Sequence, residues 1–244
     1  MRQKPPRYAI YYVPERDTAL ERLGSSLLGR DICTGDFLPQ PGLRGIAPDG
    51  IFMLTRDARR YGLHATLKPP FFLKPGVTED ELIKAAERFG KARRALSLPA
   101  LALDRIGSFF ALAMHPRDEA EAEDAEKVRF MAREAVISFD GFRAPPSVEE
   151  LDRRRSKGLS PRQEEYLLQW GYPYVLDEFC FHITLTDSVR HACLAAVLEA
   201  GLRRYMVSAV EDNRIRAIAV CRSDVAGNFT LLRRMELAGD AQSP

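Results

Sequence analysis

The stretch Gly62-Leu-His-Ala-Thr-Leu-Lys-Pro-Pro-Phe71 decides the fold of this chain, and Phe179-Cys-Phe-His-Ile-Thr-Leu-Thr186 repeats its pattern far downstream. In both stretches, apolar residues alternate with a histidine and a threonine. This is the period of a β-strand with one face buried and the other facing polar surroundings. The histidine and the threonine of each stretch therefore share a face, and the four polar positions are His64, Thr66, His182 and Thr184.

The repeated motif makes a functional role for these two histidines more credible than it would be for a single histidine. A lone histidine is more often a packing or surface residue than a functional one. The chain contains only four histidines, and two of them stand in the same His-x-Thr-Leu tetrapeptide. His115 and His191 have no such setting, and we expect them to be packing or surface residues.

The paired tetrapeptides resemble those of the two-histidine (2H, LigT-like) phosphoesterase superfamily, which includes RNA 2',3'-cyclic phosphodiesterases and the 2'-5' RNA ligase group. Longer strings resemble one branch of it more specifically, the DUF1045 proteins found with phosphonate-utilisation operons. These strings are Tyr61-Gly-Leu-His-Ala-Thr-Leu-Lys-Pro-Pro-Phe71, and Trp170-Gly-Tyr-Pro-Tyr174 leading into Phe181-His-Ile-Thr-Leu-Thr186. The resemblance covers the chain from Tyr8 to about Met235.

The composition is that of an ordinary globular chain. Of its 244 residues, 45% are hydrophobic and 29% are charged, and the formal net charge is only +2. This length is ample for a buried core. Near-neutrality argues against DNA or bulk RNA binding driven by phosphate charge, whereas a small anionic substrate needs only a local positive pocket.

The cysteines and the start of the chain indicate a cellular compartment. The four cysteines show neither metal-ligand nor disulfide spacing, and we expect reduced thiols. The basic first residues lead directly into a strand, with no apolar stretch long enough for a signal peptide or a membrane span. The sequence therefore predicts a cytoplasmic protein without a membrane partner.

Turn and cap signals divide the chain into elements. The sequence predicts a helix capped by Asp17, and an end or an edge for the first histidine strand at Pro69-Pro70, because proline donates no ladder hydrogen bond. A capping box at Thr78 and Glu81 starts another helix. Asp187 or Ser188 can cap a further helix that runs to about Tyr205. Strands are predicted at 7–13, 98–106, 109–114, 214–221 and 229–237, and a long helix at 118–138.

Two segments lack this regular pattern. Residues 31–50 are dense in glycine, proline and aspartate, and predict a long loop. Residues 140–174 predict an insertion of loops with two short helices, at 148–155 and 161–170. We expect 31–50 and 147–174 to cover the cleft and select the substrate. Residues 239–244 predict a disordered tail.

Each half of the chain holds a histidine strand, a helix and a β-hairpin in the same order. The sequence therefore predicts an α+β fold built as one bilobed domain over 1–244, from duplicated α/β units. The resemblance implies that the antiparallel sheets of these units face a central cleft lined by both histidine strands.

Two histidines and two threonines in one cleft suit the cleavage of a cyclic phosphodiester. One imidazole removes a proton from water while the other protonates the departing alkoxide. Threonine hydroxyls hold the non-bridging oxygens. The resemblance places His64, Thr66, His182 and Thr184 in the catalytic site. No cofactor and no metal is expected, because neither histidine has a companion ligand two to four residues away on its strand face.

An anionic substrate also requires positive charge and hydrogen-bond donors. Lys68 is the first candidate, because alternation places it on the face of His64 and Thr66. The remaining candidate substrate-binding residues are Tyr11, Tyr172, Arg214 and Arg222.

The resemblance implies a hydrolase that opens a sugar cyclic phosphate, in particular 5-phosphoribosyl 1,2-cyclic phosphate from carbon–phosphorus lyase metabolism. An RNA-end 2',3'-cyclic phosphodiesterase is the second hypothesis, and it would require a longer basic and aromatic track. A non-catalytic RNA- or nucleotide-binding module is the third. The partners expected are therefore a small cyclic phosphate or an RNA end, and neither DNA nor a membrane.

Overall fold

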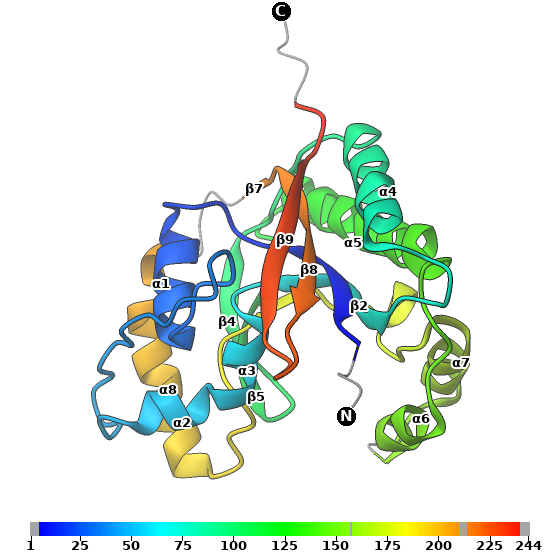
Figure 1. Ribbon diagram of the computed structural model, residues 1–244. Helices are drawn as coiled ribbons and strands as arrows, with labels where there is room; N and C mark the ends of the chain where they lie inside the picture. Colours follow the sequence, from blue (N-terminus) through cyan, green and yellow to red (C-terminus); the bar gives the residue numbers. More distant parts are fainter. Residues whose placement is uncertain (1–4, 157, 210–213, 240–244) are drawn as a thin grey trace, which may run out of the picture.

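The computed structural model describes residues 5–156, 158–209 and 214–239. Its centre is a seven-stranded antiparallel sheet (Figure 1). Across the sheet, the strands follow the order β4 (Leu101–Ile106), β5 (Phe109–Met114), β6 (His182–Thr184), β2 (Ala65–Phe72), β1 (Arg7–Tyr12), β8 (Ala217–Ser223) and β9 (Phe229–Glu236). A separate pair is formed by β3 (Leu96–Ser97) and β7 (Arg214–Ile215). The predicted α+β class with antiparallel sheets is confirmed.

The two histidine strands, however, do not face one another across a cleft. They are hydrogen-bonded neighbours in the middle of the sheet, and the single pair Ala65–Ile183 joins β2 to β6. The hairpin that comes after each histidine strand in sequence pairs into the opposite half, because β5 pairs with β6 and β8 pairs with β1. Strands from both halves therefore form one sheet, and the two histidine motifs lie next to each other at its centre.

The helices assigned are α1 (Ala19–Leu28), α2 (Gly50–Leu54), α3 (Arg56–Tyr61), α4 (Glu79–Lys91), α5 (Glu119–Asp140), α6 (Val148–Arg155), α7 (Pro161–Trp170) and α8 (Ala192–Tyr205), with short 3-10 turns at Leu176–Glu178 and Val207–Ala209. Helices pack against the sheet through several strands, with α5 on β2, α4 on β8 and β9, and α8 on β4. In Figure 1, α4 and α5 lie to the right of β8 and β9, and α1 and α8 lie to the left. One continuous core joins both halves and includes Leu67, Phe139, Ile183, Leu198 and Ile218.

Several predicted local signals hold. The capping box of Thr78 and Glu81 begins α4, and both predicted hairpins form, with β4 pairing β5 and β8 pairing β9. The cap of α1 is Thr18 rather than Asp17, since the Thr18 side chain accepts from the Glu21 amide. The segment 240–244 of the predicted tail lies outside the described residues.

Strand β2 contains two irregularities that alternation could not reveal. Tyr11 pairs with Thr66 but Ile10 pairs with Lys68, so Leu67 is an extra residue on β2. A second extra residue falls at Pro69-Pro70. Strand β6 no longer pairs with β2 at this point, so the prolines, which have no amide hydrogen, remove no hydrogen bond between these two strands. Each extra residue is a β-bulge, which reverses the face of the residues after it. Lys68 consequently shares a face with the core residue Ile10, and the predicted face of Lys68 is wrong.

Candidate active site

The two motifs form a square of side chains on the face of the sheet opposite the main core, to which Ala65 and Ile183 belong. Because Ala65 and Ile183 are directly opposed, His64 faces Thr184 and Thr66 faces His182 across the strands. Ala65 and Ile183 are fully buried, so the four polar side chains point the other way. The histidines occupy diagonal corners, where residues lie about 7–8 Å apart in antiparallel sheets and their Cβ atoms somewhat closer.

Both imidazoles are held in the same tautomer. Nδ1 of His64 lies 2.8 Å from the Gly62 carbonyl oxygen, and Nδ1 of His182 lies 2.8 Å from the Cys180 carbonyl oxygen. Because a carbonyl oxygen only accepts, each Nδ1 carries the proton and donates it. The Nε2 atoms are then the exchangeable ones, and the Thr66 hydroxyl donates to Nε2 of His64 over 3.2 Å. Each Nε2 is a base when neutral and an acid when protonated.

Local sequence explains how the first histidine is placed. Gly62 ends α3 with φ +70°, and a Cβ there would lie 2.5 Å from Cβ of Ile32, so the turn requires glycine. The carboxylate of Asp187, just after the second motif, accepts from the amides of Asp57 and Ala58 at the start of α3. Asp187 therefore ties the second motif to the helix that positions the first. The prediction that Asp187 or Ser188 caps the next helix is wrong, because His191 caps α8.

Burial keeps both imidazoles neutral. It lowers the pKa of His64 to about 4, with the hydrogen bond to Gly62 opposing the change and the charge of His182 reinforcing it. Burial also lowers the pKa of His182, opposed by the hydrogen bond to Cys180. A phosphate between the rings raises both pKa values, because it favours the imidazolium form.

Aromatic rings line the square. Tyr11, on the same face as Thr66, stacks on His64 with ring centroids 3.8 Å apart. Burial raises the pKa of Tyr11 well above its usual value, so its hydroxyl stays protonated. That hydroxyl is buried and bonds to none of the described residues. Tyr61 lies 6.3 Å from the His64 ring and Phe109 lies 5.8 Å from the His182 ring.

Tyr172, on the predicted insertion, stacks against the Arg154 guanidinium at 4.4 Å. Tyr172 also packs against the buried cluster of Val136, Tyr166 and Val175. Tyr61 and Phe109 were not among the sequence-predicted site residues. The available signals were that Tyr61 opens the first motif string and that Phe109 alternates onto the site face of β5, whose Ala111 and Ala113 pair with β6.

Three predicted substrate-binding residues lie elsewhere. The ammonium of Lys68 donates to the Val136 carbonyl at 3.0 Å and to Asp140 at 3.1 Å, on the helix side of the sheet. Arg222 pairs with Glu79 at 3.0 Å, and its strand position opposes the core residue Tyr8. Arg214 belongs to the separate β3–β7 pair. The structure therefore does not bring these three cations to the histidine pair.

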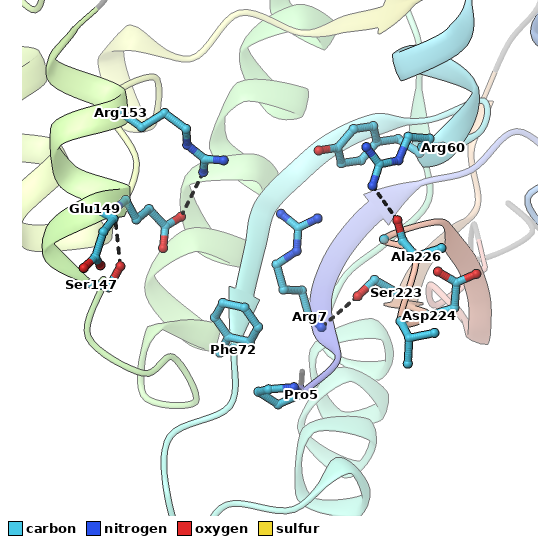
Figure 2. Close-up of a pocket in the computed structure, with 14 residues that line it drawn as sticks. Pro5, Arg7, Arg60, Phe72, Ser147, Glu149, Arg153, Ser223, Asp224 and Ala226 are labelled. Carbon is cyan, nitrogen blue, oxygen red and sulfur yellow. Dashed lines mark hydrogen bonds and ion pairs between the residues drawn. The ribbon is translucent and has the colours of Figure 1, made fainter. Parts of the chain in front are cut away.

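Tyr61 is one of the residues that line a cavity of about 510 Å³, which is drawn in Figure 2. Arginines from three elements line it: Arg7 of β1, Arg60 of α3 and Arg153 of α6. Neither histidine is among its lining residues, so Tyr61 is the link between the cavity and the square. The available sequence signals for these arginines were the basic run Arg153-Arg154-Arg155 and the alternation of Arg7 with Tyr11 on β1. The insertion reaches the cavity through α6, whereas Leu43 and Gly45 in the 31–50 loop pack on α8.

Within 5–156, 158–209 and 214–239, no group of three or more histidine, cysteine, aspartate or glutamate side chains could hold a metal ion. In the same ranges, no helix combines the length and apolar character needed to cross a bilayer.

Comparison with known proteins gives two relatives with the same name, ribose 1,5-bisphosphate phosphokinase PhnN. The protein from Janthinobacterium sp. (strain Marseille) is 34% identical over 242 residues, 97% of this chain and 52% of the relative. The protein from Laribacter hongkongensis (strain HLHK9) is 33% identical over 187 residues, 75% of this chain and 40% of the relative. The chain thus spans about half the length of the relatives that it matches.

Similar solved structures include Escherichia coli LigT in complex with 3'-AMP, with a TM-score of 0.37 and 13% identity. A structure described as a phosphoesterase has a TM-score of 0.39 and 12% identity. Each comparison covers 96% of this chain and 99% of the other.

The remaining comparison is with families. Residues 66–230 match the family described as "Protein of unknown function (DUF1045)", and this match includes Thr66 and the whole second motif. Since the match covers more than half of the chain and agrees with the resemblance drawn from the paired motifs, this chain belongs to the DUF1045 family.

Proposed function

We propose that this protein is a cyclic phosphodiesterase that opens a sugar cyclic phosphate by acid–base catalysis between His64 and His182, without a metal ion. The observation that carries the proposal is the square itself: two histidines at diagonal corners, two threonines at the others, and both Nδ1 atoms donating to backbone carbonyls. A phosphorus atom at the centre of the square has an imidazole on each of two opposite sides.

This arrangement suits an in-line displacement. Water attacks phosphorus from one side and gives its proton to the neutral Nε2 of one histidine. The P–O bond to the sugar breaks on the opposite side, and the departing oxygen takes a proton from Nε2 of the other histidine. The hydroxyls of Thr66 and Thr184 donate to the non-bridging oxygens, where negative charge grows in the transition state.

The preferred substrate in this proposal is 5-phosphoribosyl 1,2-cyclic phosphate. Adding water to phosphorus and breaking its bond to O2 leaves phosphates on O1 and O5, which is ribose 1,5-bisphosphate. The relatives carry the name of a kinase for that compound, and each is about twice as long as this chain. The proposed reaction would therefore supply the substrate named in the relatives.

Phosphorus NMR tests the proposal. The protein, in excess chelator, is incubated with 5-phosphoribosyl 1,2-cyclic phosphate and, separately, with a nucleoside 2',3'-cyclic phosphate. The expected result is rapid opening of the first compound, with ribose 1,5-bisphosphate as product. Preference for the nucleoside would instead assign the protein to RNA ends. The absence of turnover on both compounds would contradict catalysis and favour the binding module.

A further inference from the structure

The arginine cavity has no task in the acid–base mechanism. Figure 2 shows the side chains of Arg7, Arg60 and Arg153 extending from three separate elements toward one space. Three guanidinium groups and three carboxylates, those of Glu149, Glu150 and Asp224, line this cavity of about 510 Å³, so its preference for an anion depends on which of these charges are already paired.

The carboxylates beside this cavity have partners of their own. Asp224 accepts from the amide and the side chain of Asn228 within the β8–β9 turn. A hydrogen bond from Ser147 lowers the pKa of Glu149. Glu150 lies 3.8 Å from both Arg153 and Arg154 on its own helix. No ion pair to a carboxylate is found for Arg7 or Arg60 within the described ranges, so these two guanidinium groups are available to a ligand.

Arg7 and Arg60 also converge on one point. A Cβ built on Gly227 would collide with Nη2 of Arg60 and lie 3.9 Å from Nη2 of Arg7. Arg60 donates to the carbonyl oxygen of Ala226, and Arg7 lies over the Phe229 ring at 5.3 Å from its centroid. These contacts hold two like charges near each other, an arrangement that a phosphate stabilises because each guanidinium can donate two parallel hydrogen bonds to it.

The ring of Tyr61 lies between the cavity and the square of His64, Thr66, His182 and Thr184. Tyr61 lines the cavity, stacks on Phe229 at 5.3 Å and lies 6.3 Å from the His64 ring. A ligand with its reacting phosphate between the histidines and a second phosphate between Arg7 and Arg60 must span Tyr61. In a phosphorylated pentose, the ring and one exocyclic methylene separate the two phosphates, and the hydroxyls and ring carbons suit a tyrosine neighbour.

We infer that Arg7 and Arg60 form a subsite for a second, non-reacting phosphomonoester, which selects sugar cyclic phosphates that are phosphorylated at the far end of the pentose. This inference rests on the proposed function, because it assigns the other phosphate of the same substrate. The subsite distinguishes 5-phosphoribosyl 1,2-cyclic phosphate from the same compound without its 5-phosphate, and from RNA ends, where the corresponding group is a phosphodiester.

Kinetics on paired substrates test the subsite. Arg7→Gln and Arg60→Gln should each lower kcat/KM for 5-phosphoribosyl 1,2-cyclic phosphate by about tenfold or more, the usual effect of losing one hydrogen bond to a charged group. The same variants should leave kcat/KM for ribosyl 1,2-cyclic phosphate unchanged, because that compound has no second phosphate. Arg203→Gln, an exposed arginine of α8 paired with Glu199, is the matched control and should behave as wild type on both compounds.

A binding measurement keeps the subsite testable apart from turnover. Wild type should bind ribose 5-phosphate in calorimetry, and Arg60→Gln, at an exposed position of α3, should weaken that binding about tenfold. Equal binding by wild type and variant overturns the subsite. Equal losses of kcat/KM on both cyclic phosphates also overturn it while leaving the proposed function intact. Failure of wild type to open either cyclic phosphate overturns the proposed function, and the calorimetry then decides the subsite.

Discussion

Lys68 offers a quantitative test of the irregular β2 strand. Its side chain is 2% exposed, and its ammonium lies 3.1 Å from Asp140. Burial lowers the pKa of Lys68 from 10.5 to about 8, although the Asp140 carboxylate opposes this change. The folded protein therefore releases the Lys68 proton at a lower pH than the unfolded chain does.

The sign of the effect is set by proton binding. Between the folded and unfolded pKa values, the unfolded chain holds more protons, so stability rises with pH in that range. A difference of about 2.5 pKa units corresponds to about 3 kcal/mol in total. Between pH 7.5 and pH 9.5 we expect about 2 kcal/mol of this gain, lost again as the pH falls through 8.

Urea unfolding of wild type and Lys68→Met at these two pH values measures this gain. Methionine keeps the apolar stem and removes the titrating group, so the free energy of unfolding of wild type should rise by about 2 kcal/mol relative to the variant. Lys84→Met, at an exposed position of α4, should behave as wild type. If the wild-type and Lys68→Met values change in parallel, the lowered pKa of Lys68 is refuted.

The candidate site gives three further predictions. Tyr11→Phe should leave the protein equally or more stable in thermal unfolding, because the buried hydroxyl has no partner within the described ranges, and a clear loss of stability would contradict this. If the hydroxyl donates to substrate, the same variant should raise KM in steady-state kinetics. Asp187→Ala should cost about 1 kcal/mol in urea unfolding by removing the cap of α3, and no change would contradict that role. The dependence of kcat/KM on pH should have its maximum below pH 6.5, because burial lowers the pKa values of His64 and His182 and one of the two must be protonated to act as the acid. A maximum above pH 8 would refute this.

The sequence predicted the shared face of each His-Thr pair because two-residue periodicity is a local property. His64 and Thr66 precede the first bulge of β2, so alternation applies to them. Lys68 comes after that bulge, and no residue type in the motif announces an extra residue at Leu67. The error at Lys68 is thus a change of face by one residue, the smallest change that a sheet permits.

Tertiary pairing was harder to predict than local structure. The two halves of the chain were expected to face one another. Instead, the hairpin of each half pairs with the other half, through strand pairs that join residues far apart in sequence. Arg7, Arg60 and Arg153 line one cavity because β1, α3 and α6 lie close together in the folded protein. Asp187 caps a helix far upstream for the same reason. From sequence alone, Asp187 was therefore assigned to the wrong helix.

The most direct test of the central claim is single-turnover cleavage of a cyclic phosphate by His64→Gln, His182→Gln and the double variant. Each single variant should lose at least about a hundredfold in rate, and the double variant should lose little more than the slower single, because the two imidazoles act as one unit. His115→Gln, which removes an exposed imidazole paired with Asp104, should retain full activity. Full activity in either single variant would contradict a mechanism in which both histidines transfer protons.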